Sequence, residues 1–422
     1  MDVVHLVVCG LDVHKDSVVA SVIEPLGKKV KKETRTFATH TCDLYALRTW
    51  LRELRVDAIA MEGTGIYWRP IYAILEEGQP TWKLVVGNAM HIKNVPGRKT
   101  DVLDAEWLAQ LVRHGLIRPS FVPPPSFREL RDLTRYRKKL VEDRTRQRTR
   151  IQKVLQAANI KLDGVATDIF GVSGMAMLRA LAEGLATPAQ MALLAKGVLR
   201  KKIDALQTAL DGKLGATHRA MLTLALELLE AMDRTLIKLD AQIDQHVAAH
   251  EKQIERLDTL PGVDRVVAIA MLAELGPDMA VFPTAGHCAS WAGVCPGNNE
   301  SAGKHKDGRP RRGNPHLKTM LCQAAQSAAK TKGTHLRHKF YRLKARRGHN
   351  KAIMAIAHSL LIAAYAMLSK AEDYRDLGET WHDQRNRTQI AKQLTRRLTQ
   401  LGFAVALSEA APDSPIETEA PQ

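Results

Sequence analysis

The sequence predicts an α/β domain at the N-terminus, followed by long helices and a mostly α-helical C-terminal domain. Three observations carry this prediction. Short β-branched runs fill residues 3–38, and apolar strands then alternate with amphipathic helices as far as residue 115. From residue 126 onward the apolar residues repeat with helical spacing. Strands that come first and then alternate with helices favour a layered α/β fold with a mixed sheet.

The N-terminal domain is expected to begin with a hairpin. Residues 3–13 and 17–24 are β-branched runs separated by a short polar break, which is typical of two antiparallel strands. A third strand is expected over 28–38. The pattern then predicts, in order, a helix over 41–54, a strand over 57–62, a helix over 68–78, a strand over 83–88 and a helix over 101–115.

Prolines at 119 and 123–125 end this domain, and residues 126–255 are helical by pattern, with a break near 164–175. Within this region two sets of residues alternate at strict three-and-four spacing: Leu222, Leu229, Leu236 and Ile243, and Ala225, Met232, Leu239 and His246. More than three heptads of this kind indicate a coiled coil. We expect the coiled coil to be intermolecular, because the chain offers little else to cover the seam. The alternative is a long amphipathic helix packed within its own chain.

A third region opens at Leu260-Pro261-Gly262-Val263 and is also mostly helical. Residues 408–422 carry four acids, three prolines and no basic residue, which is typical of a disordered tail. The expected divisions are therefore 1–122 for the α/β domain, 123–256 for the helical and coiled-coil region, 257–369 for the C-terminal domain and 370–422 for a partly disordered tail.

Composition excludes several classes of protein. Hydrophobic residues make up 45% of the chain, which is ordinary for a globular protein and excludes wholesale disorder. We find no run that approaches the length of a membrane span and no signal peptide, and therefore expect no membrane partner. The five cysteines are scattered without a C-x-x-C pair, so a disulfide framework and a structural zinc site are not expected, and a reducing cytosol fits.

The net charge of +17 requires an acidic partner, and the excess is concentrated in two runs. Residues 126–153 hold 11 Lys and Arg with four acids, and residues 304–351 hold 15 Lys and Arg with one acid, Asp307. One such run is often only a solvated face. Two runs of the same sign favour binding to a phosphate backbone, which releases counterions and is therefore strongly salt-dependent.

Four carboxylates stand at positions where they can converge. Asp12 and Glu62 each end an apolar strand, and Asp101 and Asp104 lie three apart at the start of a helix, on one helical face. Like charges at close range require cations. Mg²⁺ accepts carboxylate oxygens and keeps water or phosphate oxygens in its other positions. Two such ions can hold the attacking and leaving oxygens of a phosphodiester.

Each carboxylate also has an ordinary structural interpretation. Asp12 is compatible with a turn residue after a strand, and Asp101 with a residue that complements the positive end of a helix. Glu62 is the hardest to explain in this way, because a carboxylate at the end of the apolar strand Ala-Ile-Ala-Met is costly without a partner.

These residues carry a resemblance. The order Asp12, Glu62, Asp101, Asp104, in the segments LDVHKDS, MEGTGIYW and GRKTDVLDAEWLAQL, resembles the DEDD transposases of insertion sequences. The resemblance implies that the N-terminal domain has the RuvC-like (RNase H-like) fold. It also implies that the four acidic residues are catalytic and bind the metal, Mg²⁺ with Mn²⁺ as an alternative.

A serine in the C-terminal region is a second candidate. Ser301 lies between Glu300 and a Gly- and Lys-rich loop, although a serine in such a loop is usually a turn or cap residue. Residues 257–345 are similar to the C-terminal transposase domain of the same family, which implies that Ser301 attacks DNA and forms a phosphoserine link. The turn at Leu260–Val263 resembles a helix-hairpin-helix, whose backbone N–H groups can hold a phosphate. An ordinary helix–helix loop is the alternative.

The partners follow from charge and from the resemblance. The residues expected to bind nucleic acid are Lys304, Lys306, Arg309, Arg311, Arg312 and Lys318 in the second run, and Arg137, Lys138, Arg144 and Arg148 in the first. The resemblance implies target and donor DNA, a guide (bridge) RNA encoded by the element, and a homotetramer whose composite sites draw on different subunits. It also implies a bacterial cytoplasmic location at the nucleoid.

Two other functions fit the same residues. A RuvC-like, metal-dependent junction nuclease would use the carboxylates alone, with water as the nucleophile and no covalent intermediate. A non-catalytic DNA-binding protein would need neither the carboxylates nor Ser301. Substitution of Ser301 separates the first alternative from the transposase, and substitution of Asp12 or Glu62 separates the second.

Overall fold

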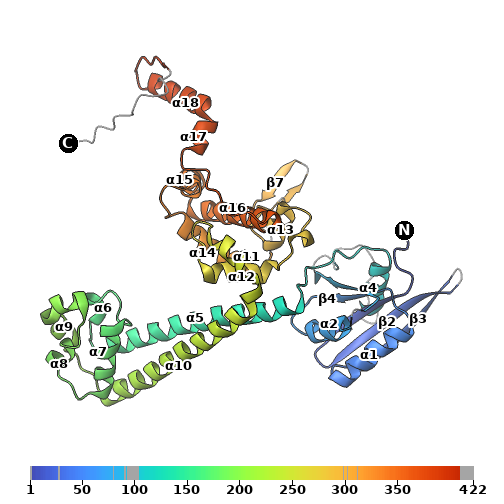
Figure 1. Ribbon diagram of the computed structural model, residues 1–422, viewed down its shortest axis with the longest axis horizontal. Coiled ribbons are helices and arrows are strands. Elements are labelled where there is room, and N and C mark those ends of the chain that lie inside the picture. The colour runs from blue at the N-terminus through green and yellow to red at the C-terminus, as the bar shows by residue number, and fades with distance from the viewer. Residues whose placement is uncertain are drawn as a thin grey trace. The chain divides into compact units, whose positions relative to one another are not determined.

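The computed structural model describes residues 2–26, 29–78, 80–89, 92, 104–297, 299–301, 303–310 and 312–408. The chain divides into two compact units, Met1–Arg128 and Glu129–Gln422 (Figure 1). The finer divisions expected at residues 122, 256 and 369 stay predictions. Of the expected tail, residues 409–422 lie outside the described residues.

The first unit is built on a mixed five-stranded sheet with the order β3-β2-β1-β4-β5. Strand β1 pairs antiparallel with β2 and parallel with β4, and β5 is parallel to β4. The strands are β1 (Val8–Val13), β2 (Ser17–Leu26), β3 (Lys29–Ala38), β4 (Ala58–Glu62) and β5 (Lys83–Gly87). The predicted N-terminal hairpin, third strand and alternation are therefore confirmed, and the α/β, RuvC-like class of this unit holds.

Helices cover both faces of this sheet (Figure 1). They are α1 (Thr41–Glu53), α2 (Trp68–Glu76) and α4 (Asp104–Arg113). Alternate residues of a strand point to opposite faces. Cys9 and Leu11 of β1 accordingly pack in a cluster with residues of α1 and α2, whereas Val8 packs in a second cluster with residues of α4. Of the helix expected over 101–115, residues 101–103 lie outside the described residues.

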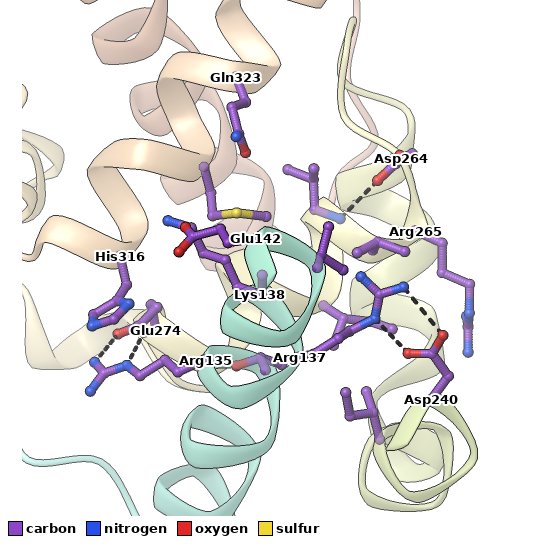
Figure 2. A pocket seen from close by; sticks show the side chains of 18 of the residues that line it. Arg135, Arg137, Lys138, Glu142, Asp240, Asp264, Arg265, Glu274, His316 and Gln323 are labelled. Carbon is purple, nitrogen blue, oxygen red and sulfur yellow. Dashed lines mark hydrogen bonds and ion pairs between the residues drawn. The ribbon is translucent and has the colours of Figure 1, made fainter. Parts of the chain in front are cut away.

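The second unit begins with two long helices that lie side by side, α5 (Pro125–Ala157) and α10 (Ala216–Val247) (Figure 1). Arg137 of α5 makes an ion pair with Asp240 of α10 at 2.5 Å, which Figure 2 shows. About two helical turns further along α5, Arg144 makes an ion pair with Asp233 of α10 at 2.5 Å. The residue number of the α10 partner falls from 240 to 233 as the residue number along α5 rises from 137 to 144, so the two helices are antiparallel.

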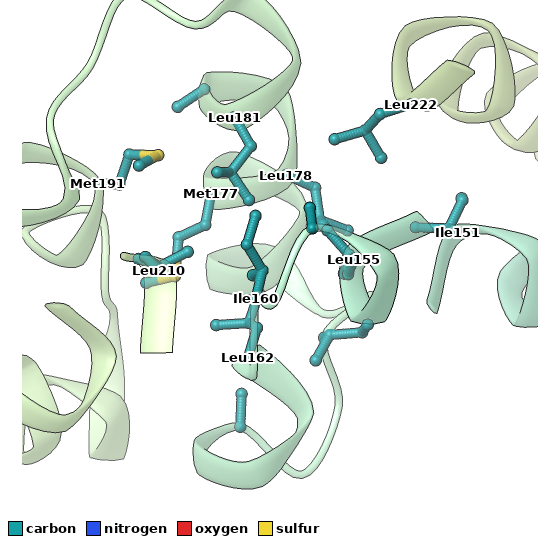
Figure 3. Packing of buried hydrophobic residues seen from close by; sticks show 14 of the residues in the cluster. Ile151, Leu155, Ile160, Leu162, Met177, Leu178, Leu181, Met191, Leu210 and Leu222 are labelled. Carbon is teal, nitrogen blue, oxygen red and sulfur yellow. The ribbon is translucent and has the colours of Figure 1, made fainter. Parts of the chain in front are cut away.

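A cap of short helices joins α5 to α10 at their far end. It consists of α6 (Leu162–Val165), α7 (Val172–Glu183), α8 (Pro188–Ala192), η2 (Gly197–Lys202) and α9 (Ile203–Leu210). Its core holds Leu155 of α5, Met177 and Leu178 of α7 and Leu222 of α10 (Figure 3). The prediction of a helical region with an internal break is confirmed, but the first long helix already ends at Ala157, before the expected break near 164–175.

The leucine seam of α10 is covered within the chain. Leu222, Leu229 and Leu236 are buried, and Gln147 of α5 donates a hydrogen bond to the carbonyl of Ala225 at 3.1 Å. The expectation of an intermolecular coiled coil along this seam is therefore wrong, and the alternative of a helix packed within its own chain is correct. The heptad pattern shows which face is buried, but α5 and, near Leu222, α7 of the cap supply the partner surface.

The remainder of the second unit is mostly helical, as predicted. Its helices are η3 (Ala248–His250), α11 (Glu251–Asp258), α12 (Arg265–Leu275), η4 (Met279–Val281), α13 (Ala285–Ala292), α14 (Pro315–Ala328), α15 (His335–Arg347), α16 (His349–Lys370), α17 (Trp381–Arg385) and α18 (Arg387–Gln400). A two-stranded antiparallel hairpin, β6 (Asn299–Ser301) and β7 (Lys304–Asp307), interrupts them between α13 and α14.

Helix α16 is long and apolar enough to cross a membrane by length and composition. The expectation that no segment approaches such a span is therefore wrong. Ile353, Leu360 and Leu361 of this helix are nevertheless buried, and α13, α14 and α15 all pack against it. Its apolar character is explained by its central position in this part of the second unit.

Candidate active site

Two carboxylates are brought together by neighbouring parallel strands. In the pairing of β1 with β4, Leu11 lies opposite Met61. Asp12 and Glu62 are the next residues along each strand, at the carboxyl ends of β1 and β4. The expectation that these two strands are neighbours is confirmed, and the two side chains share one edge of the sheet.

A third carboxylate arrives on helix α4, which packs unusually close to β1. A Cβ atom built on Gly10 would lie 1.9 Å from the carbonyl oxygen of Ala105 and 2.5 Å from the backbone nitrogen of Ala109. Only glycine permits this approach of helix to strand. Gly10 precedes Asp12 by two residues, and Ala105 follows Asp104, so the contact holds the two carboxylates at the same end of the sheet.

The three carboxylates border one cavity of about 230 Å³. Its lining consists of Asp12, Val13, Glu62, Thr64, Ile92, Asp104, Trp107 and Leu108. Three of the four expected acidic residues thus line the same cavity. The fourth, Asp101, lies outside the described residues.

Neighbouring side chains hold two of these carboxylates. The Nε2 atom of His14 lies 3.1 Å from Oδ2 of Asp12, and the hydroxyl of Thr64 donates to Oε1 of Glu62. Each contact engages one oxygen of its carboxylate.

The donor set fits a hard divalent cation. Mg²⁺ is usually bound through one or two carboxylates while it keeps several waters, so it does not need a complete cage of protein ligands. In the described residues no three His, Cys, Asp or Glu side chains lie close enough together to hold a metal ion by themselves. Asp12, Glu62 and Asp104 therefore offer oxygen ligands around a space, with room for water and phosphate oxygens.

Ser301 lies at the tip of the second unit's hairpin, residues 299–307, here called the serine hairpin. Ser301 pairs with Lys304 across the turn, where Gly303 has φ of +73°. The side chains of Ser301, Lys304 and Lys306 lie outside the described residues, as do Ala302 and Arg311. The backbone alone therefore puts Ser301 beside the tight turn that joins the two strands.

The base of the serine hairpin is anchored to its own unit. The backbone nitrogen of Gly297 donates to the carbonyl of Arg309 at 3.1 Å. Gly313 packs so closely on Gly293 that a Cβ atom on Gly313 would lie 2.4 Å from its backbone nitrogen. Asn314 then caps α14, accepting at Oδ1 from the backbone nitrogens of His316 and Leu317.

Sequence reasoning missed a buried carboxylate behind this anchor, Glu274 of α12. Its side chain is only 3% exposed, and its oxygens accept from Arg135 Nε at 2.7 Å, from Arg135 Nη2 at 2.8 Å and from Asn314 Nδ2 at 2.6 Å. Burial raises the pKa of Glu274, but the hydrogen bonds and charge of Arg135, with the charge of Arg131, outweigh it and the pKa is lowered. The lone acid in the apolar sequence of α12 was the available signal.

The first basic run is engaged largely within the chain. Arg137 and Arg144 pair with Asp240 and Asp233 of α10, and the Arg148 guanidinium lies 4.9 Å from the ring centroid of Phe170. Lys138 lines a second cavity, of about 390 Å³, between α5, α10, α12 and α14 (Figure 2). In the second run Arg309 and Arg312 are exposed and Lys318 is half-buried. We therefore expect nucleic acid to be bound by the second run more than by the first.

The turn between α11 and α12 is occupied by packing. A Cβ atom on Gly262, which has φ of +80°, would lie 2.4 Å from the backbone nitrogen of Ala328 in α14. The start of α12 is already capped, because the Asp264 carboxylate accepts from the backbone nitrogen of Val267 at 2.8 Å. A carboxylate at this point repels phosphate, so the geometry favours the ordinary helix–helix loop over a phosphate-binding hairpin.

Two family models match the chain. A model described as Transposase matches residues 9–160, and a model described as Transposase IS116/IS110/IS902 family matches residues 254–342. The first match contains Asp12, Glu62 and Asp104, and the second contains Ser301 and Glu274.

Individual proteins show the same similarity. The chain is 32% identical over 145 residues to the insertion element IS110 uncharacterized 43.6 kDa protein of Streptomyces coelicolor, a match that covers 32% of this chain and 33% of that relative. It is 28% identical over 326 residues to the insertion element IS116 uncharacterized 44.8 kDa protein of Streptomyces clavuligerus, covering 68% and 78%. It is 29% identical over 133 residues to the transposase for insertion sequence element IS1111A of Coxiella burnetii, covering 31% and 36%. The first and third matches span about a third of each relative.

Proposed function

We propose that this chain, which belongs to the DEDD-type transposase family of insertion sequences, cuts and rejoins DNA strands with two chemically different groups. The first is the carboxylate pocket of the N-terminal unit. The second is the hydroxyl of Ser301. The observation that carries the proposal is that Asp12, Glu62 and Asp104 line one cavity, because carboxylates of like charge around one cavity repel one another and favour a bound cation there.

In this proposal Asp12, Glu62 and Asp104, together with Asp101, hold Mg²⁺ or Mn²⁺. A bound divalent ion supplies a Lewis acid that orients a phosphate and stabilises the charge that develops on its oxygens. The protein contributes the orientation of its own oxygens. Thr64 and His14 each fix one carboxylate by a hydrogen bond, and the Gly10 contact fixes the helix that carries Asp104.

Ser301 is proposed as the nucleophile. Its Oγ atom forms a bond to phosphorus while one P–O bond of the DNA backbone breaks, and the hydroxyl proton ends on the DNA oxygen that leaves. The product is a phosphoserine ester between protein and DNA. Attack on that ester by the hydroxyl of another strand reverses the step and rejoins DNA, so the energy of the phosphodiester is retained and no ATP is needed. The position of Ser301 beside a tight turn supports access to a strand.

The proposed partners are target DNA and donor DNA, bound through the second basic run, whose Arg309 and Arg312 are exposed. A guide RNA encoded by the element, and a homotetramer in which different subunits complete each site, are proposed on the family resemblance alone. Since residues of α5 and α7 cover the seam of α10, we expect such an assembly to use other surfaces. The proposed location is the bacterial cytoplasm, at the nucleoid.

A metal-dependent junction nuclease is the second candidate, because the three carboxylates lie together in the first unit and need no serine to bind a cation. In that case water attacks the phosphate and no covalent protein–DNA product forms.

Denaturing electrophoresis of the protein with end-labelled DNA that spans the element's junction, with and without RNA transcribed from the flanking noncoding stretch, tests these proposals. The wild-type protein should give cleaved strands and a slow protein–DNA band. Ser301→Ala should abolish both, and Asp12→Asn should abolish both. Cleavage that persists in Ser301→Ala without the slow band would establish the nuclease. Activities unchanged in both Asp12→Asn and Glu62→Gln would overturn both candidates.

A further inference from the structure

A large aromatic ring borders the carboxylate pocket. Trp107 lies three residues after Asp104 on α4, on the same helical face, and lines the same cavity. It is half-buried and packs at the edge of the apolar cluster beneath α4. Binding of a hydrated ion does not require an indole ring at this position, because the ion's ligands are oxygens.

The loop after Glu62 exposes further apolar surface a few residues along the chain from the pocket. Thr64 lines the cavity, and the chain then turns at Gly65, whose φ is +63°. The next two residues, Ile66 and Tyr67, are 66% and 45% exposed. Two large apolar side chains are thus held in solvent directly after a carboxylate of the site, where they stabilise no core.

Three other tryptophans of this unit have packing partners. Trp50 is buried and contacts Phe37 with ring centroids 5.6 Å apart, and buried Trp82 donates to the carbonyl of Leu75 at 3.1 Å. Trp68 meets Tyr72 edge to face. Trp107 also packs on its cluster, but it lines the carboxylate cavity as well, and Ile66 and Tyr67 are exposed, so these three residues present apolar surface that the core does not cover.

We propose that Trp107, Ile66 and Tyr67 form a stacking rim, which receives an unpaired base of the substrate strand beside the phosphate held at the carboxylate pocket. The inference rests on the proposed function, because that function brings a DNA phosphate to the pocket. Every base has an aromatic face, so stacking on protein rings is tolerant of sequence. A base within a duplex is already stacked and must leave the helix first, so the ligand is an unpaired or extruded base.

Charge sets a condition on this binding. The floor of the pocket carries Asp12, Glu62 and Asp104, which repel a phosphate unless a divalent cation lies between them. Stacking on the rim should therefore depend on the cation, whereas attachment of DNA to the basic residues of the second unit should not. The two modes of binding can be separated by adding or chelating Mg²⁺.

The test uses full-length protein and a single-stranded DNA of about twelve nucleotides, a length within the usual site size for such binding, with one 2-aminopurine among thymidines. The fluorescence of 2-aminopurine falls when the base stacks on an aromatic ring. With Mg²⁺ present, wild-type protein should quench it strongly. Trp107→Leu and Tyr67→Leu should each lose most of the quench, and Trp107→Phe should retain it because the ring is kept.

Tyr45→Leu is the matched control, since Tyr45 is a similarly exposed tyrosine of the same unit, 41% accessible, on α1. It should quench as the wild type does. In cleavage assays Trp107→Leu should raise KM about fivefold or more, the usual effect of one lost base stack, with a smaller change in kcat. The proposal of a stacking rim would be overturned if Trp107→Leu quenched the fluorescence as strongly as the wild type does. It would also be overturned if the wild type quenched equally with and without Mg²⁺.

Failure of the rim and failure of the proposed function give different results. Loss of cleavage in Asp12→Asn together with full quenching by Trp107→Leu removes the rim and keeps the function. Quenching that depends on Trp107 and Mg²⁺, while Asp12→Asn cleaves normally, keeps the rim as a base-binding site and removes the catalytic role of the carboxylates.

Discussion

The guanidinium of Arg135 holds the carboxylate of Glu274 through two hydrogen bonds, Nε to Oε1 at 2.7 Å and Nη2 to Oε2 at 2.8 Å (Figure 2). The pair joins α5 to α12. Because Glu274 Oε2 also accepts from Asn314, the residue that caps α14 directly after the basic loop, the same carboxylate ties the base of the serine hairpin to α5. One buried acid thus connects three segments that are far apart in the sequence.

Glu274→Ala should lower the free energy of unfolding by about 3–5 kcal/mol, because it leaves the largely shielded Arg135 guanidinium, 24% exposed, without its partner. Urea denaturation followed by circular dichroism measures this. The matched control is Glu142→Ala, which removes a carboxylate of α5 that pairs with Lys139 at an exposed position, and which should cost less than about 1 kcal/mol. Equal effects of the two substitutions would contradict the structural role of Glu274.

The same carboxylate gives stability a defined pH dependence. Arg135 and Arg131 hold the pKa of Glu274 below its ordinary value of 4.5 in the folded protein. The stabilisation is therefore complete above the unfolded pKa and is lost as the pH falls through the lower, folded pKa. The difference in unfolding free energy between wild type and Glu274→Gln should be largest near neutral pH and should shrink below about pH 4. A difference that grows on acidification would show the opposite sign of shift.

Gly10→Ala should displace α4 from β1. The new methyl group would overlap the backbone of Ala105, which cannot move aside as a flexible side chain can. Overpacking of this kind costs about 1–3 kcal/mol or more, and here it also moves Asp104, so strand cleavage should be lost with the stability. Gly164→Ala is the control, since a Cβ atom there meets nothing within 4 Å, and it should change stability by less than about 1 kcal/mol.

The carboxylates were accessible to sequence reasoning because each sits where a local pattern ends. Asp12 and Glu62 close apolar strands, and parallel strands with aligned ends bring such residues together. The reason that α4 can approach them, the missing side chain of Gly10, is a tertiary contact that no local spacing encodes. Trp107 likewise appears as one more apolar residue of a helix until its cavity is known.

The errors have a related cause. Periodicity in α10 correctly marks Leu222 and Leu229 as buried, but a heptad pattern has no information on which chain covers it. Charge counting has the same limit. Arg137 and Arg144 contribute to a basic run, although their partners Asp240 and Asp233 lie about a hundred residues later, on the antiparallel helix. Glu274 was overlooked, although the argument applied to Glu62 also applies to an acid in apolar α12.

Leu229→Ala and Leu224→Ala distinguish the two possible partners of the α10 seam. Leu229 is only 1% exposed, and the residues that bury it belong to the same chain. Its truncation to alanine should therefore lower the free energy of unfolding by about 2–5 kcal/mol. Leu224, on the same helix but 66% exposed, should cost less than about 0.5 kcal/mol. Sedimentation should give the wild-type oligomeric state for both variants. A shift of the Leu229→Ala variant toward smaller species would show that the α10 seam packs between chains.

Salt dependence separates the two basic runs. Arg312 is exposed in the loop that follows the serine hairpin, so Arg312→Gln should weaken binding to any DNA sequence and reduce the slope of log K against log salt by about 1. Arg137→Gln removes the same charge from α5, where Asp240 neutralises it, and should leave the slope unchanged. Fluorescence anisotropy over a salt series measures both. An equal fall in slope for Arg137→Gln would show that its ion pair opens to receive phosphate, and that the first run also belongs to the nucleic-acid surface.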